Sequence, residues 1–366
     1  MLMAKRIKIL YTIPNFDTAG SGKVVYDLVK GLDKTVFDPE ICCFHDNGAY
    51  FQTIKTLGVK IHIFNFTTAY RPMISFPSRV LEIYRFFRLH KFDIIHSWHW
   101  SSDISEPLAA RLAGVPFIYT KKAMGWSSRY WKWRSKLSTK IVAINEDMVT
   151  QYFSGMMEKI EKIPLGINTK MFQPNSKFDL NRGSLELKET DFVVITVANL
   201  VAVKGIEILI QAIKILNEDR IKLLIVGDYD NSYGNVLKAD YECDNIRFFG
   251  KKLDVRPYLS IADVFVISTK DLGEGMPIAP LEAMSSGRIT IGSDVSGIKD
   301  ILSPFPEQLF EADNVDDLRS KLADIINLKE IDKSKLEKQM AEHVKNKYSI
   351  VQFIEQHEAL YKKLIL

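Results

Sequence analysis

Cysteine and long apolar runs are both scarce in this sequence of 366 residues. The three cysteines, Cys42, Cys43 and Cys243, form neither a CxxC pair nor a metal-ligand spacing, and so sparse a set favours a reducing compartment. No apolar run reaches the roughly 18 residues that a membrane-spanning helix needs. The first residues lead directly into a strand pattern rather than into a signal peptide. We therefore expect a cytoplasmic protein.

The motifs of several enzyme classes are missing as well. Residues 20–23 (GSGK) resemble part of a Walker loop, but Asp17 stands where its first glycine belongs and Val24 where its Ser or Thr belongs. What remains is a glycine loop between a strand and a helix, either a phosphate-approaching loop or a simple tight turn. The DxD at 228–230 is better explained as a surface turn. The histidines form no HExxH, so we expect neither a metal nor a cofactor.

Charge is small in total but uneven along the chain. Residues 1–168 hold 23 Lys and Arg against 14 Asp and Glu, a net +9, whereas the remaining residues hold 26 against 31, a net −5. A basic first half is typical of a protein with anionic partners, although a chance imbalance would give the same numbers.

Strand and helix patterns alternate along the whole chain. Strands are predicted at 6–13, 92–98, 192–197, 221–226 and 264–267, and helices at 105–112 and 205–216. Such alternation predicts doubly wound parallel sheets, an α/β fold.

A polar stretch without periodicity at 169–189 separates two such series. We predict a Rossmann-like domain at 1–168, a second at 169–348, and a C-terminal helix at 349–366 that packs back on the first domain. The cleft between two such domains is the natural place for a site.

Two carboxylates mark the stretch 268–297. Glu274 lies in a glycine-rich turn, and Glu282 lies eight residues further on, in the apolar segment 279–284, which predicts the first turns of a helix. A strand precedes them, so both fall at the carboxyl end of a strand, where anionic ligands commonly bind. Because carboxylates do not bind phosphate, their expected partners are hydroxyl groups of a ribose or a sugar.

Lys204 opens the helix predicted at 205–216, an unfavourable place for a cation. Either an anion such as a diphosphate compensates it, or the lysine is solvated at the surface. His96 and His99 lie at the end of the strand at 92–98. We interpret His96 as a core histidine and His99 as the better candidate for a ligand contact.

The stretch 121–140 contains seven Lys and Arg and no acidic residue. Trp126, Tyr130 and Trp133 are spaced as on one helix face. Three interpretations stay open: a helix packed on its own domain, a contact with anionic lipid, and, least favoured, single-stranded nucleic acid. The candidate patch for an acceptor or a membrane comprises Trp126, Arg129, Lys132, Trp133, Arg134 and Lys136.

Five segments in order resemble one family. The stretch 268–297 is similar to the EG…LEAM…G signature of the retaining GT-B glycosyltransferases of family GT4, also called glycosyl transferases group 1. Segments 18–25, 162–174, 194–209 and 248–268 resemble further motifs of that family. The resemblance implies two Rossmann-like domains facing a cleft, and a nucleotide-diphosphate sugar, UDP- or GDP-linked, as donor.

The resemblance also implies roles for individual residues. Glu282 would hold the ribose, Glu274 the sugar, and Lys204 the diphosphate. His99 would contact the donor sugar or the acceptor across the cleft. The other implied donor-binding positions are Gly20, Asn199, Gly227, Gly275, Met276 and Pro277. Asn199 stands where the family usually has an arginine, and the histidine motif matches imperfectly.

The expected function is sugar transfer, with retention of configuration, to a glycan or a lipid-linked acceptor. We expect a place in bacterial surface polysaccharide or lipopolysaccharide biosynthesis, peripheral contact with anionic lipid on the inner face of the plasma membrane, and no nucleic acid. Two alternatives remain: a sugar-nucleotide epimerase of the same architecture, and a catalytically weakened sugar-nucleotide-binding subunit.

Overall fold

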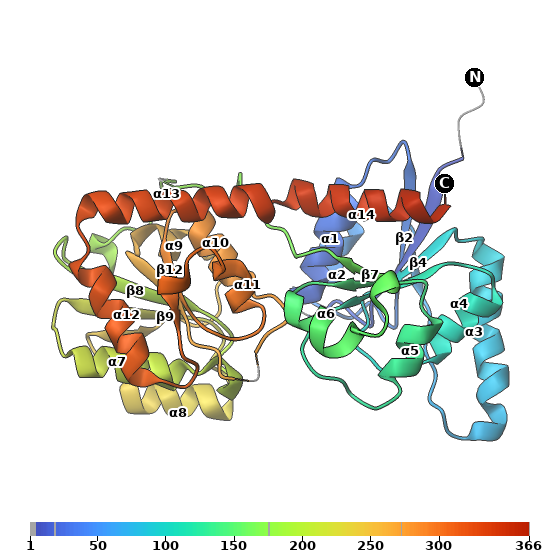
Figure 1. The fold of residues 1–366 in the computed structure, drawn as a ribbon, viewed down its shortest axis with the longest axis horizontal. Coiled ribbons are helices and arrows are strands. Elements are labelled where there is room, and N and C mark those ends of the chain that lie inside the picture. Colours follow the sequence, from blue (N-terminus) through green and yellow to red (C-terminus); the bar gives the residue numbers. More distant parts are fainter. Residues whose placement is uncertain (1–4, 18–19, 175, 272, 366) are drawn as a thin grey trace. The chain divides into compact units, whose positions relative to one another are not determined.

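A computed structural model describes residues 5–17, 20–174, 176–271 and 273–365. The chain divides into two compact units. The first consists of Met1–Leu165 together with Ile350–Leu366, and the second of Gly166–Ser349. Each unit contains one parallel sheet with helices around it (Figure 1).

The first unit contains a seven-stranded sheet in the order β3-β2-β1-β4-β5-β6-β7, and every pair of neighbouring strands is parallel. The strands are β1 Ile7–Thr12, β2 Phe37–Cys43, β3 Ile61–Ile63, β4 Ile94–Ser97, β5 Phe117–Lys121, β6 Lys140–Ala143 and β7 Ile160–Lys162. The central strands β4 and β5 are buried along their whole length, as is usual for a parallel sheet covered on both faces.

Seven helices and two short 3₁₀ turns accompany this sheet in the described part of the unit. They are α1 Gly20–Gly31, α2 Phe51–Lys55, η1 Met73–Ser75, α3 Phe76–His90, α4 Ser105–Leu112, α5 Trp131–Leu137, α6 Glu146–Phe153, η2 Met157–Lys159 and α14 Ile350–Ile365. The final helix packs against α1 so tightly that a Cβ on Gly31 would lie 2.1 Å from Cδ1 of Ile354. A buried hydrogen bond of 3.0 Å from Tyr11 in β1 to the Tyr361 hydroxyl also holds it.

The second unit contains a six-stranded parallel sheet in the order β10-β9-β8-β11-β12-β13. Its strands are β8 Phe192–Val197, β9 Ile221–Val226, β10 Ile246–Phe248, β11 Val264–Ile267, β12 Ile289–Ser293 and β13 Leu309–Phe310. Its helices are α7 Ile206–Leu216, α8 Ser232–Tyr241, α9 Arg256–Ile261, α10 Ala279–Ser285, α11 Ile298–Leu302, α12 Val315–Asn327 and α13 Glu330–Lys347, with 3₁₀ turns η3 Gly183–Leu185, η4 Ala202–Lys204 and η5 Pro306–Gln308.

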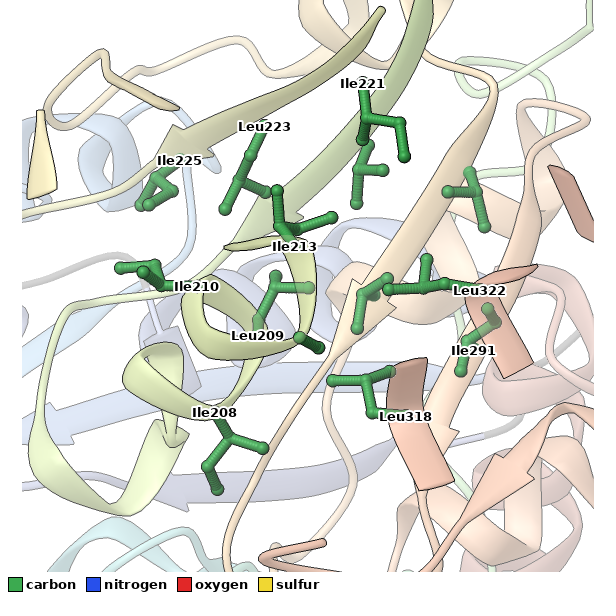
Figure 2. Close-up of a cluster of buried hydrophobic side chains, with 14 of the residues drawn as sticks. Ile208, Leu209, Ile210, Ile213, Ile221, Leu223, Ile225, Ile291, Leu318 and Leu322 are labelled. Carbon is green, nitrogen blue, oxygen red and sulfur yellow. The ribbon is translucent and has the colours of Figure 1, made fainter. Parts of the chain in front are cut away.

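Branched aliphatic residues form the core of the second unit. Figure 2 shows Leu209 and Ile213 of α7 meeting Leu223 of β9, with Leu318 and Leu322 of α12 beside them. These residues recur every three or four positions along α7 and α12, the period that places them on one helix face. The core therefore fixes α7 against the sheet, and with it the loop from β8 that leads into α7.

Both sheets have the strand order of a doubly wound fold, which confirms the α/β prediction. The order reverses between β1 and β4 in the first sheet and between β8 and β11 in the second. At such a switch point the two loops leaving the carboxyl ends of neighbouring strands run in opposite directions and leave room for a ligand. Among the described residues, we find no helix that is both long and apolar enough to cross a membrane.

Candidate active site

The loops after β8 and β11 meet at the switch point of the second unit. The Ser268 hydroxyl donates to the backbone carbonyls of Lys204 at 3.1 Å and Gly205 at 2.9 Å. The backbone N–H of Lys270 donates to the carbonyl of Val203 at 2.9 Å. Gly205 has φ +57°, and a Cβ there would lie 2.2 Å from the Ser268 carbonyl, so only glycine permits this approach. The two loops therefore form one rigid edge.

Lys204 and Glu274 face each other across this edge. Nζ of Lys204 lies 2.5 Å from Oε2 of Glu274, with both side chains mostly buried. The Thr269 hydroxyl donates to the other carboxylate oxygen. The sequence offered a diphosphate or solvent as compensation for Lys204; the structure shows that Glu274 supplies negative charge beside it.

The turn that carries Glu274 rests on the segment after β12. The backbone N–H of Glu274 donates to the Ser296 carbonyl at 3.0 Å. Gly297 has φ +81°, and a Cβ there would lie 2.5 Å from the carbonyl oxygen of Gly275. Gly275 is buried, as are Met276 and Pro277. Close packing of two backbones thus sets the position of the Glu274 side chain.

Three other predicted donor residues lie on the loops of the same sheet edge. Glu282 is half-buried in the first turn of α10, which begins at Ala279 as the sequence predicted. Gly227 follows β9, and a Cβ there would lie 1.7 Å from the Ala198 carbonyl. Asn199 is exposed in the loop after β8.

The DxD segment behaves as a turn. The backbone N–H of Asp230 donates to Oδ1 of Asp228 at 3.0 Å, a local Asx-type bond. Among the described residues, no group of three or more His, Cys, Asp and Glu is placed to hold a metal ion.

A set of contacts around Glu207, which fixes the loop after β11, was not predicted from the sequence. Nζ of Lys270 lies 2.5 Å from Oε1 of Glu207 in the first turn of α7, and the Tyr233 hydroxyl donates to Oε2. Burial opposes ionisation of Glu207, but the bonds from Lys270 and Tyr233 outweigh it and lower the pKa of Glu207. These residues are separated by up to 63 positions in the sequence, so no local pattern indicates them.

At the switch point of the first unit, His99 follows β4 and Gly20 begins α1. His99 packs edge-on against Phe44 and Phe66, each at 5.9 Å between ring centroids. Burial, followed by the nearby charges of Arg134 and Lys122, lowers the pKa of His99 to about 3. Its Nδ1 has no hydrogen-bond partner among the described residues. His99 is therefore a neutral imidazole with an unused ring nitrogen.

Positive charge lies close to Gly20. Nζ of Lys122 donates to the Ser21 hydroxyl at 2.9 Å, which brings the lysine to the first turn of α1. Burial lowers the pKa of Lys122 to about 8. Lys122 is one of the basic residues of 121–140, but Ser21 lies 101 positions away in the sequence, so no local pattern predicts this contact.

His96 is a core residue, as interpreted. Its Nδ1 lies 2.7 Å from the Tyr361 hydroxyl, and its Nε2 lies 2.8 Å from Oγ1 of Thr120. The residue is fully buried, and burial, followed by the charge of His357, holds its pKa well below the usual range.

The prediction for Arg134 as a patch residue is wrong. Arg134 is fully buried, and its Nη2 lies 3.0 Å from Oε2 of the equally buried Glu106. It also donates to the Ser97 hydroxyl at 3.0 Å and to the Asp103 carbonyl at 2.8 Å. The guanidinium therefore fixes the loop after β4 through Ser97 and Asp103. It also gives the buried carboxylate of Glu106 the charged partner that a buried charge needs.

The expected helix face of Trp126, Tyr130 and Trp133 is also wrong. The helix α5 begins at Trp131, so Trp126 precedes it in a loop and stacks on Trp131 at 4.8 Å between ring centroids. Nζ of Lys121 lies 4.1 Å above the Trp126 ring. Trp126 thus belongs partly to the interior of the unit. The exposed members of the predicted patch are Arg129, Lys132, Trp133 and Lys136.

Two family models match the sequence. Glycosyltransferase Family 4 matches residues 18–171, and Glycosyl transferases group 1 matches residues 177–347. The two units are both doubly wound, and each sheet has one point at which its strand order reverses, as in the GT-B fold. Both family models describe glycosyltransferases, so the protein belongs to that class of enzyme. The chain belongs to the GT-B glycosyltransferases of family GT4.

Known proteins resemble the chain over most of its length. The UDP-Gal:alpha-D-GlcNAc-diphosphoundecaprenol alpha-1,3-galactosyltransferase of Escherichia coli is 28% identical over 314 residues, 78% of this chain and 79% of that protein. A glycosyltransferase from Rickettsia africae superposes with a TM-score of 0.86 at 17% identity, covering 99% of both chains. Anabaena Alr3699/HepE in complex with UDP superposes with a TM-score of 0.81 at 16% identity, covering 97% of this chain and all of that one.

Proposed function

We propose that this enzyme transfers a sugar from a UDP- or GDP-linked donor to a lipid-linked or glycan acceptor, with retention of configuration and without a metal. The observation that carries the proposal is the pairing of Lys204 with Glu274 at the switch point of the second unit. A cation and a carboxylate at that place match the two halves of a nucleotide sugar, one anionic and the other rich in hydroxyls.

Each residue at this edge has a role in the proposal. Lys204 stabilises the charge that grows on the departing diphosphate, the step at which preorganised charge gives the largest rate gain. Glu274 accepts hydrogen bonds from the sugar hydroxyls, beside the backbone of residues 275–277. Glu282 binds the ribose, and the close turn at Gly227 admits the nucleotide near the sheet edge. The Thr269 hydroxyl keeps Glu274 oriented while Lys204 turns to the donor.

The first unit supplies a neutral imidazole. With a pKa of about 3, His99 carries no charge at neutral pH, so it can lie beside a sugar hydroxyl as a neutral ring without repelling Lys122. The first turn of α1 at Gly20, with Lys122 beside it, adds positive charge for a phosphate.

The proposed acceptor class follows from the relatives. The E. coli relative is named for a diphosphoundecaprenol-linked acceptor and for UDP-Gal, and HepE was solved with UDP. We therefore favour a lipid-linked acceptor in bacterial surface polysaccharide or lipopolysaccharide synthesis. The enzyme would act at the cytoplasmic face of the plasma membrane, with Arg129, Lys132, Trp133 and Lys136 on the acceptor side.

Calorimetric titration tests the donor half of the proposal. We expect UDP or GDP to bind the wild type and to raise its melting temperature, because a ligand that binds only the folded state stabilises it. The variant Glu282→Ala should bind the same nucleotide at least about tenfold more weakly. If no nucleoside diphosphate binds, the proposal fails.

Asn199 supports the alternative that the chain is a catalytically weakened sugar-nucleotide-binding subunit. It stands where related enzymes usually have an arginine, so Lys204 is left as the main cation for the diphosphate. Tight nucleotide-sugar binding without turnover, restored by a second protein, would favour that alternative.

A further inference from the structure

Five large apolar side chains are exposed on the first unit and belong to three separate segments. Met73 is 79% exposed and Ile74 94%, both in η1; Trp100 is 45% exposed after β4; Tyr130 and Trp133 are 37% and 58% exposed at α5. We call this set the apolar rim. Single exposed apolar side chains need no explanation, but a contiguous set of them marks an interaction surface.

Three contacts bring these segments together. The rings of Tyr70 and Tyr130 lie 5.0 Å apart between centroids, which joins the chain before η1 to the chain before α5. The Tyr70 hydroxyl donates to the Ser102 carbonyl at 3.1 Å, and the Ser102 hydroxyl donates to the Ser128 carbonyl at 3.1 Å. The loop after β4 is therefore bound to both other segments, and the apolar rim is one region of the surface.

The surroundings of the apolar rim are basic. The sequence contains no Asp or Glu from residue 47 to 81, nor from 107 to 145, and these two stretches contain four of the five rim residues. Arg71, Arg129, Lys132 and Lys136 are exposed there, and none has a carboxylate within 4.0 Å in the described part of the chain.

Some of these cations lie over aromatic rings instead. Nζ of Lys136 lies 5.5 Å from the ring centroid of Trp133, and the guanidinium of Arg129 lies 5.8 Å from that of Tyr130. Exposed cations interleaved with Trp, Tyr and aliphatic side chains have the chemistry of the boundary between lipid head groups and acyl chains.

We propose that the apolar rim docks on an anionic lipid bilayer, with Met73 and Ile74 entering the acyl boundary and the surrounding cations binding the lipid phosphates. Opposite charge selects this occupant over a second copy of the chain, because two copies would bring the same cations together. Trp100 is the residue next to His99, so a bilayer at the rim reaches the loop that carries the proposed acceptor contact. The value of this contact for lipid-linked acceptors depends on the proposed function, whereas bilayer binding itself does not.

Vesicle sedimentation of the full chain without any substrate tests the docking. We expect the wild type to bind vesicles of phosphatidylcholine mixed with phosphatidylglycerol, and to bind pure phosphatidylcholine weakly. The double variant M73S/I74S should bind the mixed vesicles at least about tenfold more weakly. Its fold should be intact, since both side chains are exposed.

The matched control is V236S/L253S, which removes two exposed apolar side chains from the second unit, 57% and 103% exposed. It should bind the mixed vesicles as the wild type does. Equal binding of M73S/I74S and the wild type would overturn the proposal. Loss of a dimer in M73S/I74S, with no vesicle binding by the wild type, would also overturn it in favour of a second copy.

Nucleotide binding by the same variants separates the two proposals. M73S/I74S should keep the wild-type affinity for UDP or GDP, because neither Met73 nor Ile74 is among the proposed donor-binding residues. Failure of nucleotide binding in the wild type would remove the proposed function and leave the vesicle result standing.

Discussion

Nζ of Lys204 lies 2.5 Å from Oε2 of Glu274, so the two groups proposed to bind opposite ends of the donor are in direct contact with each other. Lys204 comes from the loop after β8 and Glu274 from the loop after β11, the two strands between which the sheet order reverses. A donor diphosphate would replace the carboxylate as partner of Lys204, and Glu274 would be released toward the sugar. The contact between the two side chains thus fixes the orientation of both groups at the sheet edge.

The first prediction concerns this pair. Replacing Lys204 with Met should lower turnover by about 10²- to 10³-fold, because the cation stabilises charge that develops in the transition state. The free energy of unfolding should fall by about 1–3 kcal/mol, since the mostly buried carboxylate of Glu274 loses its charged partner. K204M/E274Q should lose little more activity than the worse single variant, as expected of residues that act together. Lys214→Met, an exposed lysine on α7, is the control; equal activity of K204M and this control would contradict the role.

Gly297→Ala should displace the turn that carries Glu274. The added Cβ would lie 2.5 Å from the Gly275 carbonyl and 2.8 Å from that of Glu274, so the turn must move. We expect nucleotide-sugar affinity to fall and stability to drop by about 1–3 kcal/mol. Gly58→Ala is the control that separates backbone strain from steric contact. Gly58 also has a positive φ, +66°, but no neighbouring atom lies within 4 Å of an added Cβ. If both variants bind donor as the wild type does, the packed turn does not position Glu274.

Arg134→Met should be strongly destabilising. The change leaves the carboxylate of Glu106 buried without its charged partner, at a cost of about 3–5 kcal/mol. R134M/E106Q should recover part of that loss, because the neutral amide can keep the bonds to Thr12 and Ser97. Urea denaturation measures both. Lys132→Met, an exposed neighbour on α5, should stay within about 0.5 kcal/mol of the wild type, and an equally small effect at Arg134 would refute its structural role.

The pH dependence of stability should report His357. Burial lowers its pKa to about 4, its Nδ1 donates to the Phe353 carbonyl at 2.8 Å, and its Nε2 finds no partner among the described residues. The pKa of His357 in the unfolded chain is about 6.5. The folded state therefore has its full stability above about pH 6.5, where His357 is neutral in both states. As the pH falls from about 6.5 toward about 4, only the unfolded chain takes up the proton, and the free energy of unfolding falls by about 3 kcal/mol. His357→Phe should therefore show a shallower fall in unfolding free energy over that range. Parallel profiles for the two proteins would contradict this assignment.

The sequence was sufficient for features that local patterns encode. Strands β8, β9 and β11 and helix α4 have the predicted bounds, because runs of branched residues and a 3.6-residue period report burial directly. The apolar segment after Glu274 likewise predicted α10 from Ala279.

Features that depend on distant residues were not predictable in this way. Arg134 looks like one more basic residue of 121–140, and only the fold brings it to Glu106, 28 positions away. The partner of Lys204 lies 70 positions away, and the sequence indicated only a compensating anion such as a diphosphate or a solvated lysine, not this ion pair. The prediction that Trp126 lies on a helix face was wrong for a different reason. The helix α5 starts only at Trp131, later than the spacing of the aromatic residues suggested. Contacts such as that of Lys121 Nζ with the Gly125 carbonyl at 2.6 Å hold the preceding residues in a loop.

The central claim is tested most directly by following a radiolabelled hexose from its UDP- or GDP-linked donor in the presence of an undecaprenyl-diphosphate-linked acceptor. We expect the wild type to move label into the organic phase and to release one nucleoside diphosphate for each sugar transferred. Lys204→Met should lower that rate by at least about a hundredfold, and Glu282→Ala should lower it by at least about tenfold when the donor is below saturation. Label that stays on the nucleotide as a different hexose, or transfer at the wild-type rate by both variants, would contradict it.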